Sequence, residues 1–248
     1  MALIWQKQVG ANRYEVRTHG ATVRLYSNGV FHSQWNPNDP LKGSLWELLL
    51  LPAFFLPQGR VQRVLILGVG GGALIRLLQR FVQPERIVGV DIDRHHLTVA
   101  KRFFGVSGAT LVCADAREFV AELSADGESE PFDLIVDDLF GHIEGVAERA
   151  VAADNSWCRQ LLELLAPGGL LVSNFGCRRE LLQSGWRAPE IRARLQSAYC
   201  ADLPGYENCV GVFSPEPLSR SLLTEWAPAQ INPSNPSRRL QARLRILR

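Results

Sequence analysis

The chain has 248 residues, 46% of them apolar, so it can bury a large core and wholesale disorder is excluded. Its formal net charge of +2 does not by itself predict a nucleic-acid or membrane partner. Five scattered cysteines without a CxxC pair argue against a disulfide framework or a zinc site and fit a reducing compartment.

Short strands separated by turn signals fill the first 36 residues. The segments RYEVRT, TVRLYS and VFHSQW read as strands, and Asn28-Gly29 is typical of a hairpin turn. Residues 44–56 predict a buried helix closed by Pro57 and Gly59. This apolar stretch is too short to span a bilayer, and the N-terminus has no signal-peptide core. We therefore expect a cytoplasmic protein without a membrane partner, beginning with a β-strand segment plus helix over residues 1–57.

Strands and helices alternate from residue 61 onward. This order predicts a Rossmann-like, doubly wound α/β domain with a mostly parallel sheet, over residues 58–225. A further helix is expected near 188–198. Two strands around Pro204-Gly205 are close enough in sequence to pair antiparallel, so the sheet should end in a reversed strand. The expected helices within the alternating region lie at 72–82, 94–104, 116–123 and 156–165.

The last segment, residues 226–248, reads as a linker, INPSNPS, followed by a basic tail. Arginines cluster there, at positions 238, 239, 243, 245 and 248. The tail could contact nucleic acid, or it could form an amphipathic helix with Leu240, Leu244 and Leu247 on one face. We favour the helix, because one short arginine cluster without interleaved aromatic residues is weak support for nucleic-acid binding.

The segment LILGVGGGALIRLL, residues 65–78, joins a strand to a helix through a glycine loop. Gly68, Gly70 and Ala73 fit the dinucleotide fingerprint G-x-G-x-x-G/A. Gly68, Gly70 and Gly72 equally fit the G-x-G-x-G loop of S-adenosylmethionine enzymes. Asp91 ends the next strand and can bind ribose hydroxyls in either case.

Acids at the ends of later strands distinguish the two cofactors. Asp115 follows the third strand, and Asp137 and Asp138 end the fourth, so their carboxylates should face one crevice. An adenosyl sulfonium cofactor has a use for all of them, whereas a nicotinamide enzyme does not. Each acid taken singly could instead be a helix N-cap.

With these motifs the sequence resembles the spermidine synthase family, the polyamine aminopropyltransferases, which are built on the class I methyltransferase fold. The resemblance covers roughly residues 12–215. It rests on the order of VRLYSNGVFHSQW, LWELLLLPAFF, VLILGVGGGALIRLL, IVGVDIDRHHLTVAKRFF, LVCADAREFV and FDLIVDDLFG.

The resemblance implies a cofactor, S-adenosylmethionine or its decarboxylated form, with S-adenosylhomocysteine or methylthioadenosine as product. It implies that Asp138 is the catalytic aspartate, which accepts a proton from the acceptor. No metal is expected in the site. The implied cofactor-binding residues are the three glycines above, Asp91 for the ribose, Asp115 with Ala116 for the adenine, His32 near the cofactor's tail, and Ile92. His142 could assist Asp138. Trp35 and Trp46 could close over an apolar acceptor.

Three departures from the family pattern concern the acceptor. Gly71 replaces the acid of the family's G-G-G-D-G-G loop, Gly141 replaces the second acid of D-S-S-D, and Leu45-Trp46-Glu47 replaces Tyr-His-Glu. A diamine is a dication whose burial needs several carboxylates. Putrescine is therefore expected to be a poor acceptor, unless Asp137, Glu47 or Glu144 supplies the missing charge.

The loss of the acid at Gly71 also removes a negative charge from beside the cofactor's tail, so that a carboxylate on this tail is tolerated. This favours ordinary S-adenosylmethionine and methyl transfer to a small-molecule acceptor, with aminopropyl transfer as the alternative. A catalytically inactive nucleotide-binding module and a nicotinamide oxidoreductase are further alternatives, which the intact Asp138 and Asp115 disfavour. The small strand-rich N-terminal segment also predicts a homodimer, because its edges need cover.

Overall fold

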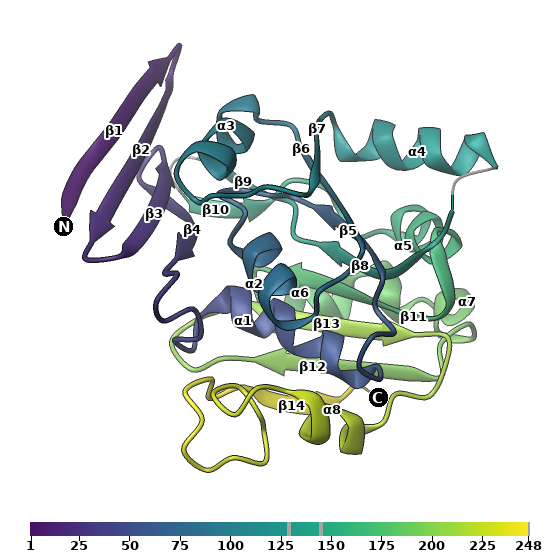
Figure 1. Cartoon of the computed structure of the whole chain (residues 1–248). Helices are drawn as coiled ribbons and strands as arrows, with labels where there is room; N and C mark the ends of the chain where they lie inside the picture. The colour runs from purple at the N-terminus through teal and green to yellow at the C-terminus, as the bar shows by residue number, and fades with distance from the viewer. Residues whose placement is uncertain (128–129, 144–145, 248) are drawn as a thin grey trace.

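The structure is a computed structural model that describes residues 1–127, 130–143 and 146–247 (Figure 1). Its largest element is a mixed sheet covered by helices on both faces, and a smaller antiparallel sheet stands to one side of it (Figure 1). The predicted fold class, a Rossmann-like α/β domain with an N-terminal β segment, is confirmed.

The N-terminal sheet has the order β1-β2-β3-β4 and is antiparallel throughout. Its turn between β3 and β4 is the predicted one, with Asn28 and Gly29 at φ values of 51° and 83°. The first strand was not anticipated from the sequence. The strands are β1 (Ala2–Val9), β2 (Asn12–His19), β3 (Thr22–Ser27) and β4 (Val30–Trp35).

The predicted helix over 44–56 consists of two pieces. An α-helix, α1 (Leu45–Leu50), passes directly into a 3₁₀ helix, η1 (Leu51–Phe55), with Pro52 near its start. Proline has no backbone N–H to donate to the preceding turn, which accounts for the change of helix type there. Both pieces are buried, so their apolar character reflects packing against the main domain.

The central sheet has the strand order β14-β12-β13-β11-β8-β5-β6-β7. The strands from β11 to β7 are parallel to one another, and β13 is antiparallel to both of its neighbours. The reversed strand was predicted, and it lies inside the sheet. The strands are β5 (Arg63–Leu67), β6 (Arg86–Asp91), β7 (Thr110–Cys113), β8 (Phe132–Asp137), β11 (Leu165–Phe175), β12 (Ser197–Asp202), β13 (Cys209–Ser214) and β14 (Arg243–Ile246).

Side chains alternate between two separate cores along the central strands. In β5, Val64 and Ile66 belong to one core, and Leu65 and Leu67 belong to the other. Both faces of the sheet are therefore buried. The helices are α2 (Ala73–Phe81), α3 (Arg94–Arg102), α4 (Ala116–Asp126), α5 (Asn155–Glu163), α6 (Arg178–Gln183), η2 (Gly185–Arg187), α7 (Pro189–Arg192) and α8 (Arg220–Trp226).

The helix expected near 188–198 is wrong over its second half. The α-helix α7 ends at Arg192, and Ser197 already pairs with Ser214 of β13. The apolar residues that follow, such as Ala198, serve the sheet, where pairing with β13 outweighs local helix propensity.

The helical interpretation of the basic tail is also wrong. Residues Arg243–Ile246 form β14, which pairs antiparallel with β12 at the sheet edge. Leu240 and Leu247 are buried, so they do pack inward, but from an extended segment. Within the described residues, no helix is long and apolar enough to cross a membrane.

Candidate functional site

A cavity of about 550 Å³ opens at the carboxyl ends of the parallel strands. The glycine loop after β5 and the acids after β6, β7 and β8 line it, and residues of the N-terminal sheet form part of its wall. This is where open α/β sheets bind their ligands. Most of the predicted site residues are thus brought together: Gly68, Gly70, Asp91, Ile92, Asp115, Ala116, Asp138 and His32 all line this cavity.

Gly68 allows the loop to pass close to the end of β8. A Cβ atom at this position would lie 2.1 Å from the backbone oxygen of Asp138, and the residue has a φ of 92°. Both conditions require glycine. Gly72 does not line the cavity; it is the N-cap of α2 and lies behind the loop.

Gly71 is fixed by packing. A Cβ atom here would lie 2.7 Å from the Phe104 ring and 2.7 Å from Cβ of Ser33. The backbone N–H of Gly71 donates a hydrogen bond of 2.9 Å to Oγ of Ser33, which holds the N-terminal sheet against the loop. The space that an acid would need at this position is therefore already filled by the chain itself.

Asp91 organises the glycine loop. One carboxylate oxygen accepts hydrogen bonds from the N–H groups of Val69 (3.0 Å) and Gly70 (2.9 Å), and the other accepts from Asp93 (2.8 Å). Nδ1 of His96 lies 3.6 Å from the first oxygen. Burial opposes ionisation of Asp91, but the contacts with His96 and the backbone donors hold its pKa below the usual value.

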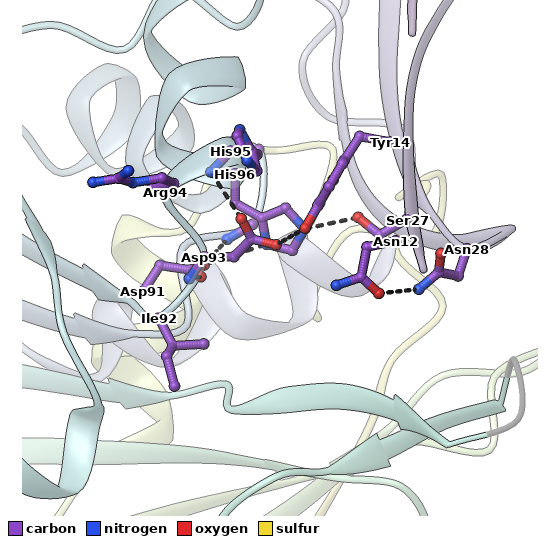
Figure 2. Close-up of polar contacts among 12 residues, drawn as sticks. Asn12, Tyr14, Ser27, Asn28, Asp91, Ile92, Asp93, Arg94, His95 and His96 are labelled. Carbon is purple, nitrogen blue, oxygen red and sulfur yellow. Dashed lines mark hydrogen bonds and ion pairs between the residues drawn. The ribbon is translucent and has the colours of Figure 1, made fainter. Parts of the chain in front are cut away.

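Figure 2 shows how the N-terminal sheet reaches this acid. The Tyr14 hydroxyl donates a hydrogen bond of 2.6 Å to Asp93, and the Ser27 hydroxyl is 2.8 Å from Nε2 of His96. Burial lowers the pKa of His96, but the neighbouring Asp91 raises it by more, so the histidine favours its charged form. The two parts of the chain thus share one polar network beside the expected ribose position.

The residues assigned to the adenine, Asp115 and Ala116, lie between the end of β7 and the start of α4, and Ile92 follows the neighbouring β6. Asp115 is the N-cap of α4, where it accepts a hydrogen bond of 2.8 Å from the N–H of Arg117, and it also pairs with the Arg117 guanidinium at 2.7 Å. The bond with the Arg117 side chain is the main reason that the pKa of Asp115 lies below its usual value. Ile92 is 73% exposed, so an apolar surface is available there to a flat ligand. The assignment of these residues to adenine stays a prediction.

Asp138 stands across the cavity from the ribose side. Its carboxylate accepts a hydrogen bond of 2.7 Å from the Asn174 side chain, whose oxygen in turn accepts one of 3.2 Å from Asn208. Burial, reinforced by the negative charge of Asp137, raises the pKa of Asp138 to about 7. A carboxyl group with this pKa is suited to accept a proton near neutral pH.

Two acids that could have supplemented Asp138 are occupied elsewhere. Asp137 is fully buried and forms an ion pair with Arg149, with hydrogen bonds of 3.2 Å from Trp157 and Ser173. Glu47 accepts hydrogen bonds from the backbone of Lys42 and Gly43 and from the Ser44 hydroxyl. Neither lines the cavity. Glu144 and the side chain of His142 lie outside what the structure describes.

Of the two tryptophans expected near the cavity mouth, Trp46 lines the cavity and Trp35 does not. Trp46 makes an edge contact with Phe31, their ring centroids 5.2 Å apart. The Arg76 guanidinium lies 5.3 Å from the ring centroid of Trp35. His32 lines the cavity beside His96, with ring centroids 5.0 Å apart.

Sequence reasoning missed several lining residues because their positions depend on tertiary contacts. His96 read as an ordinary helix residue, and Tyr14 as one strand residue among many. Asn174 was not singled out, although it follows a buried strand in the same way as the acids. Position at a strand end was the one signal that could have identified it.

Comparison with known proteins agrees with the geometry. Residues 64–169 match the family model described as a methyltransferase domain. A polyamine aminopropyltransferase from Aeropyrum pernix is 32% identical over 136 residues, which are 51% of this chain and 41% of that protein. The chain thus spans less than half the length of this curated relative.

Two solved structures share the fold. A probable spermidine synthase from Corynebacterium glutamicum has a TM-score of 0.73 at 16% identity and covers 99% of this chain and 91% of its own. Human methyltransferase-like protein 13, in complex with SAH, has a TM-score of 0.62 at 22% identity and covers 73% of this chain and 87% of its own. The chain therefore has the class I methyltransferase fold, residues 64–169 are similar to methyltransferase domains, and about half of the chain is similar in sequence to polyamine aminopropyltransferases.

Proposed function

We propose that the chain is a transferase that binds S-adenosylmethionine in this cavity and directs its methyl group to a small acceptor. The observation that carries the proposal is the place of Asp138, which faces the cavity from β8 with a pKa raised to about 7. Burying the charge of the Asp138 carboxylate costs stability. We therefore attribute the position of this carboxylate to function and not to stabilisation of the fold.

The residues present fit an adenosyl nucleotide. The loop at Gly68 passes close to the backbone of Asp138, and Asp91 and Asp115 present carboxylates to the same cavity. Ile92 and Ala116 add apolar surface next to these acids. When bound, S-adenosylmethionine supplies an electrophilic carbon attached to a positively charged sulfur.

Asp138 would act on the acceptor. Its carboxylate removes a proton from the attacking atom, whose lone pair forms the new bond to carbon as the carbon–sulfur bond breaks. Asn174 holds the carboxylate in place by donating to one of its oxygens. The other chain residues act by position, because an in-line displacement depends chiefly on alignment.

Methyl transfer is favoured over aminopropyl transfer by the surroundings of Gly71. The Phe104 ring and Ser33 occupy the space where the family's loop acid would project, so this acid cannot assist in binding an amino group. Aminopropyl transfer from the decarboxylated cofactor is the second candidate, and the similarity to polyamine aminopropyltransferases supports it.

The test offers each cofactor in turn with a panel of small amines that includes putrescine, and identifies products by mass spectrometry. A methylated product from S-adenosylmethionine is expected. A faster aminopropyl product from the decarboxylated form would establish the second candidate instead. Binding of both cofactors without any product would indicate an inactive nucleotide-binding module.

A further inference from the structure

The sheet order divides the cavity into two sides. Asp91 ends β6 and Asp115 follows β7, on one side of β5, while Asp138 follows β8 and Asn174 lies on β11, on the other. Asn208, which also lines the cavity, lies in the connection between β12 and β13. Given the proposed function, the first side takes the nucleotide, so the side around Asp138 is left for the acceptor.

Carboxylates are scarce on the acceptor side. Asp138 is the one acid of the described lining residues that belongs to it, since Asp91, Asp93 and Asp115 lie after β6 and β7. The polar neighbours of Asp138, Asn174 and Asn208, are neutral amides. This side of the cavity therefore offers one carboxylate, that of Asp138, which can pair with one cationic nitrogen of the acceptor.

Aromatic rings also line the cavity, and Phe140 and Tyr206 are each two residues away in the sequence from Asp138 or Asn208. Four of them form what we call the aromatic wall: Phe31, Trp46, Phe140 and Tyr206. Phe31 and Trp46 are in edge-to-face contact, at an interplanar angle of 86°. Burial, followed by the negative charge of Glu47, raises the pKa of the Tyr206 hydroxyl, so this group favours its neutral form. The wall is aromatic and uncharged, and the rings of Phe31 and Trp46 offer it both a face and an edge.

A positive charge stands next to the aromatic wall. The Arg24 guanidinium lies 5.8 Å from the centroid of the Phe31 ring. Its charge offsets part of the rise in the pKa of Tyr206 that burial causes. Its Nε donates to the side-chain oxygen of Gln34, a neutral group. A second ammonium entering this region would meet like charge, and it would lose its hydration without gaining a carboxylate.

We infer that the acceptor is a small monoamine with a flat apolar body, its nitrogen at Asp138 and its body against the aromatic wall. This inference rests on the proposed function. An aromatic body suits the rings of the wall by stacking and by burial of apolar surface. A diamine of similar length is disfavoured by Arg24 and by the single acid.

The direct test uses the full chain saturated with S-adenosylhomocysteine, into which phenethylamine or putrescine is titrated by calorimetry. Phenethylamine is expected to bind at least tenfold more tightly than putrescine. Equal or tighter binding of putrescine would overturn the inference, as would failure of both amines to bind the loaded protein. Failure of S-adenosylhomocysteine to bind in the first step would instead contradict the proposed function.

Two variants test whether the aromatic wall binds the body of the amine. Trp46→Leu should lower phenethylamine affinity about tenfold and leave S-adenosylhomocysteine binding unchanged, whereas Trp226→Leu, on the exposed side of α8, should change neither. If Trp46→Leu does not fold, as a thermal melt would show, Phe31→Leu at the cavity mouth serves in its place. Unchanged phenethylamine affinity in the folded variant would refute the role of the wall.

A third variant should reduce the preference for phenethylamine over putrescine. Among the side chains that the structure describes, a Cβ at Gly141 would meet Ala150 alone, at 3.8 Å, so Gly141→Asp fits and adds a second acid to the lining. Putrescine affinity should then rise about tenfold while phenethylamine gains little. No gain for putrescine would mean that missing charge is not what excludes a diamine.

Discussion

Replacing Asp138 by asparagine separates the charge of this group from its shape. The variant Asp138→Asn keeps the size of the side chain, and its amide oxygen can still accept the bond that Asn174 donates at 2.7 Å. It removes the negative charge that burial opposes, together with any capacity to accept a proton. Stability and activity should therefore change in opposite directions.

The magnitude follows from the pKa of Asp138, which rises from 3.8 to about 7 in the folded chain. A carboxyl group with a higher pKa in the folded than in the unfolded chain costs stability as it ionises. This cost is absent below pH 4, grows as the pH rises toward 7, and is constant above it. At about 1.36 kcal/mol per pH unit the full cost is roughly 4 kcal/mol, and partial contact with cavity water reduces it to about 2–4 kcal/mol.

Urea unfolding of both proteins at pH 5 and pH 8 measures this cost. The variant should be the more stable protein at pH 8, and its advantage should grow by about 2 kcal/mol between the two pH values. Its turnover should fall by about 10²–10⁴-fold, because a general base is lost. An advantage that does not change with pH would refute the account of Asp138, as would a variant that retains full activity.

Asp91→Ala should weaken methylthioadenosine binding by about 2–4 kcal/mol, since it removes an acid for the ribose and the anchor of the loop at Val69 and Gly70; calorimetry that finds wild-type affinity would place the site elsewhere. Gly71→Asp should lower the free energy of unfolding by about 3 kcal/mol, because the new side chain overlaps Phe104 and Ser33, whereas Gly141→Asp should cost less than about 1 kcal/mol in the same urea titration. Sedimentation should give a dimer mass, because β1 is an exposed edge strand carrying Leu3, Ile4 and Val9; a mass of 27.6 kDa at micromolar concentration would contradict this.

The alternating core of this fold could be predicted from its sequence because local pattern and final structure agree there. The run from Arg63 to Phe81 is a strand, a glycine loop and a helix in both, since each element buries a face dictated by its own periodicity. The same holds for the acids at strand ends, whose convergence follows from the parallel order of the strands.

The remaining features depend on contacts that a local pattern does not carry. The tail residues around Leu244 become a strand because the edge of β12 offers backbone partners. The hairpin of β9 (Phe140–Ile143) and β10 (Val146–Arg149) was not anticipated, yet it brings Arg149 to the buried Asp137. Similarly, the contacts of His96 with Ser27 and His32 come from the N-terminal sheet, more than sixty residues away in the sequence.

The reason for glycine at position 71 also became visible only in three dimensions. From the sequence, the residue marks the loss of an acid from a family motif. In the folded chain Phe104 and Ser33 fill the place of that acid, and Ser33 ties the loop to the N-terminal sheet.

Calorimetric titration of the chain with S-adenosylhomocysteine and, separately, with NAD tests the central claim most directly. The account predicts that S-adenosylhomocysteine binds with one site per chain, that Asp91→Ala weakens this binding, and that NAD binds at least a hundredfold more weakly. Tighter binding of NAD, or no binding of S-adenosylhomocysteine, would contradict an adenosyl sulfonium site in this cavity.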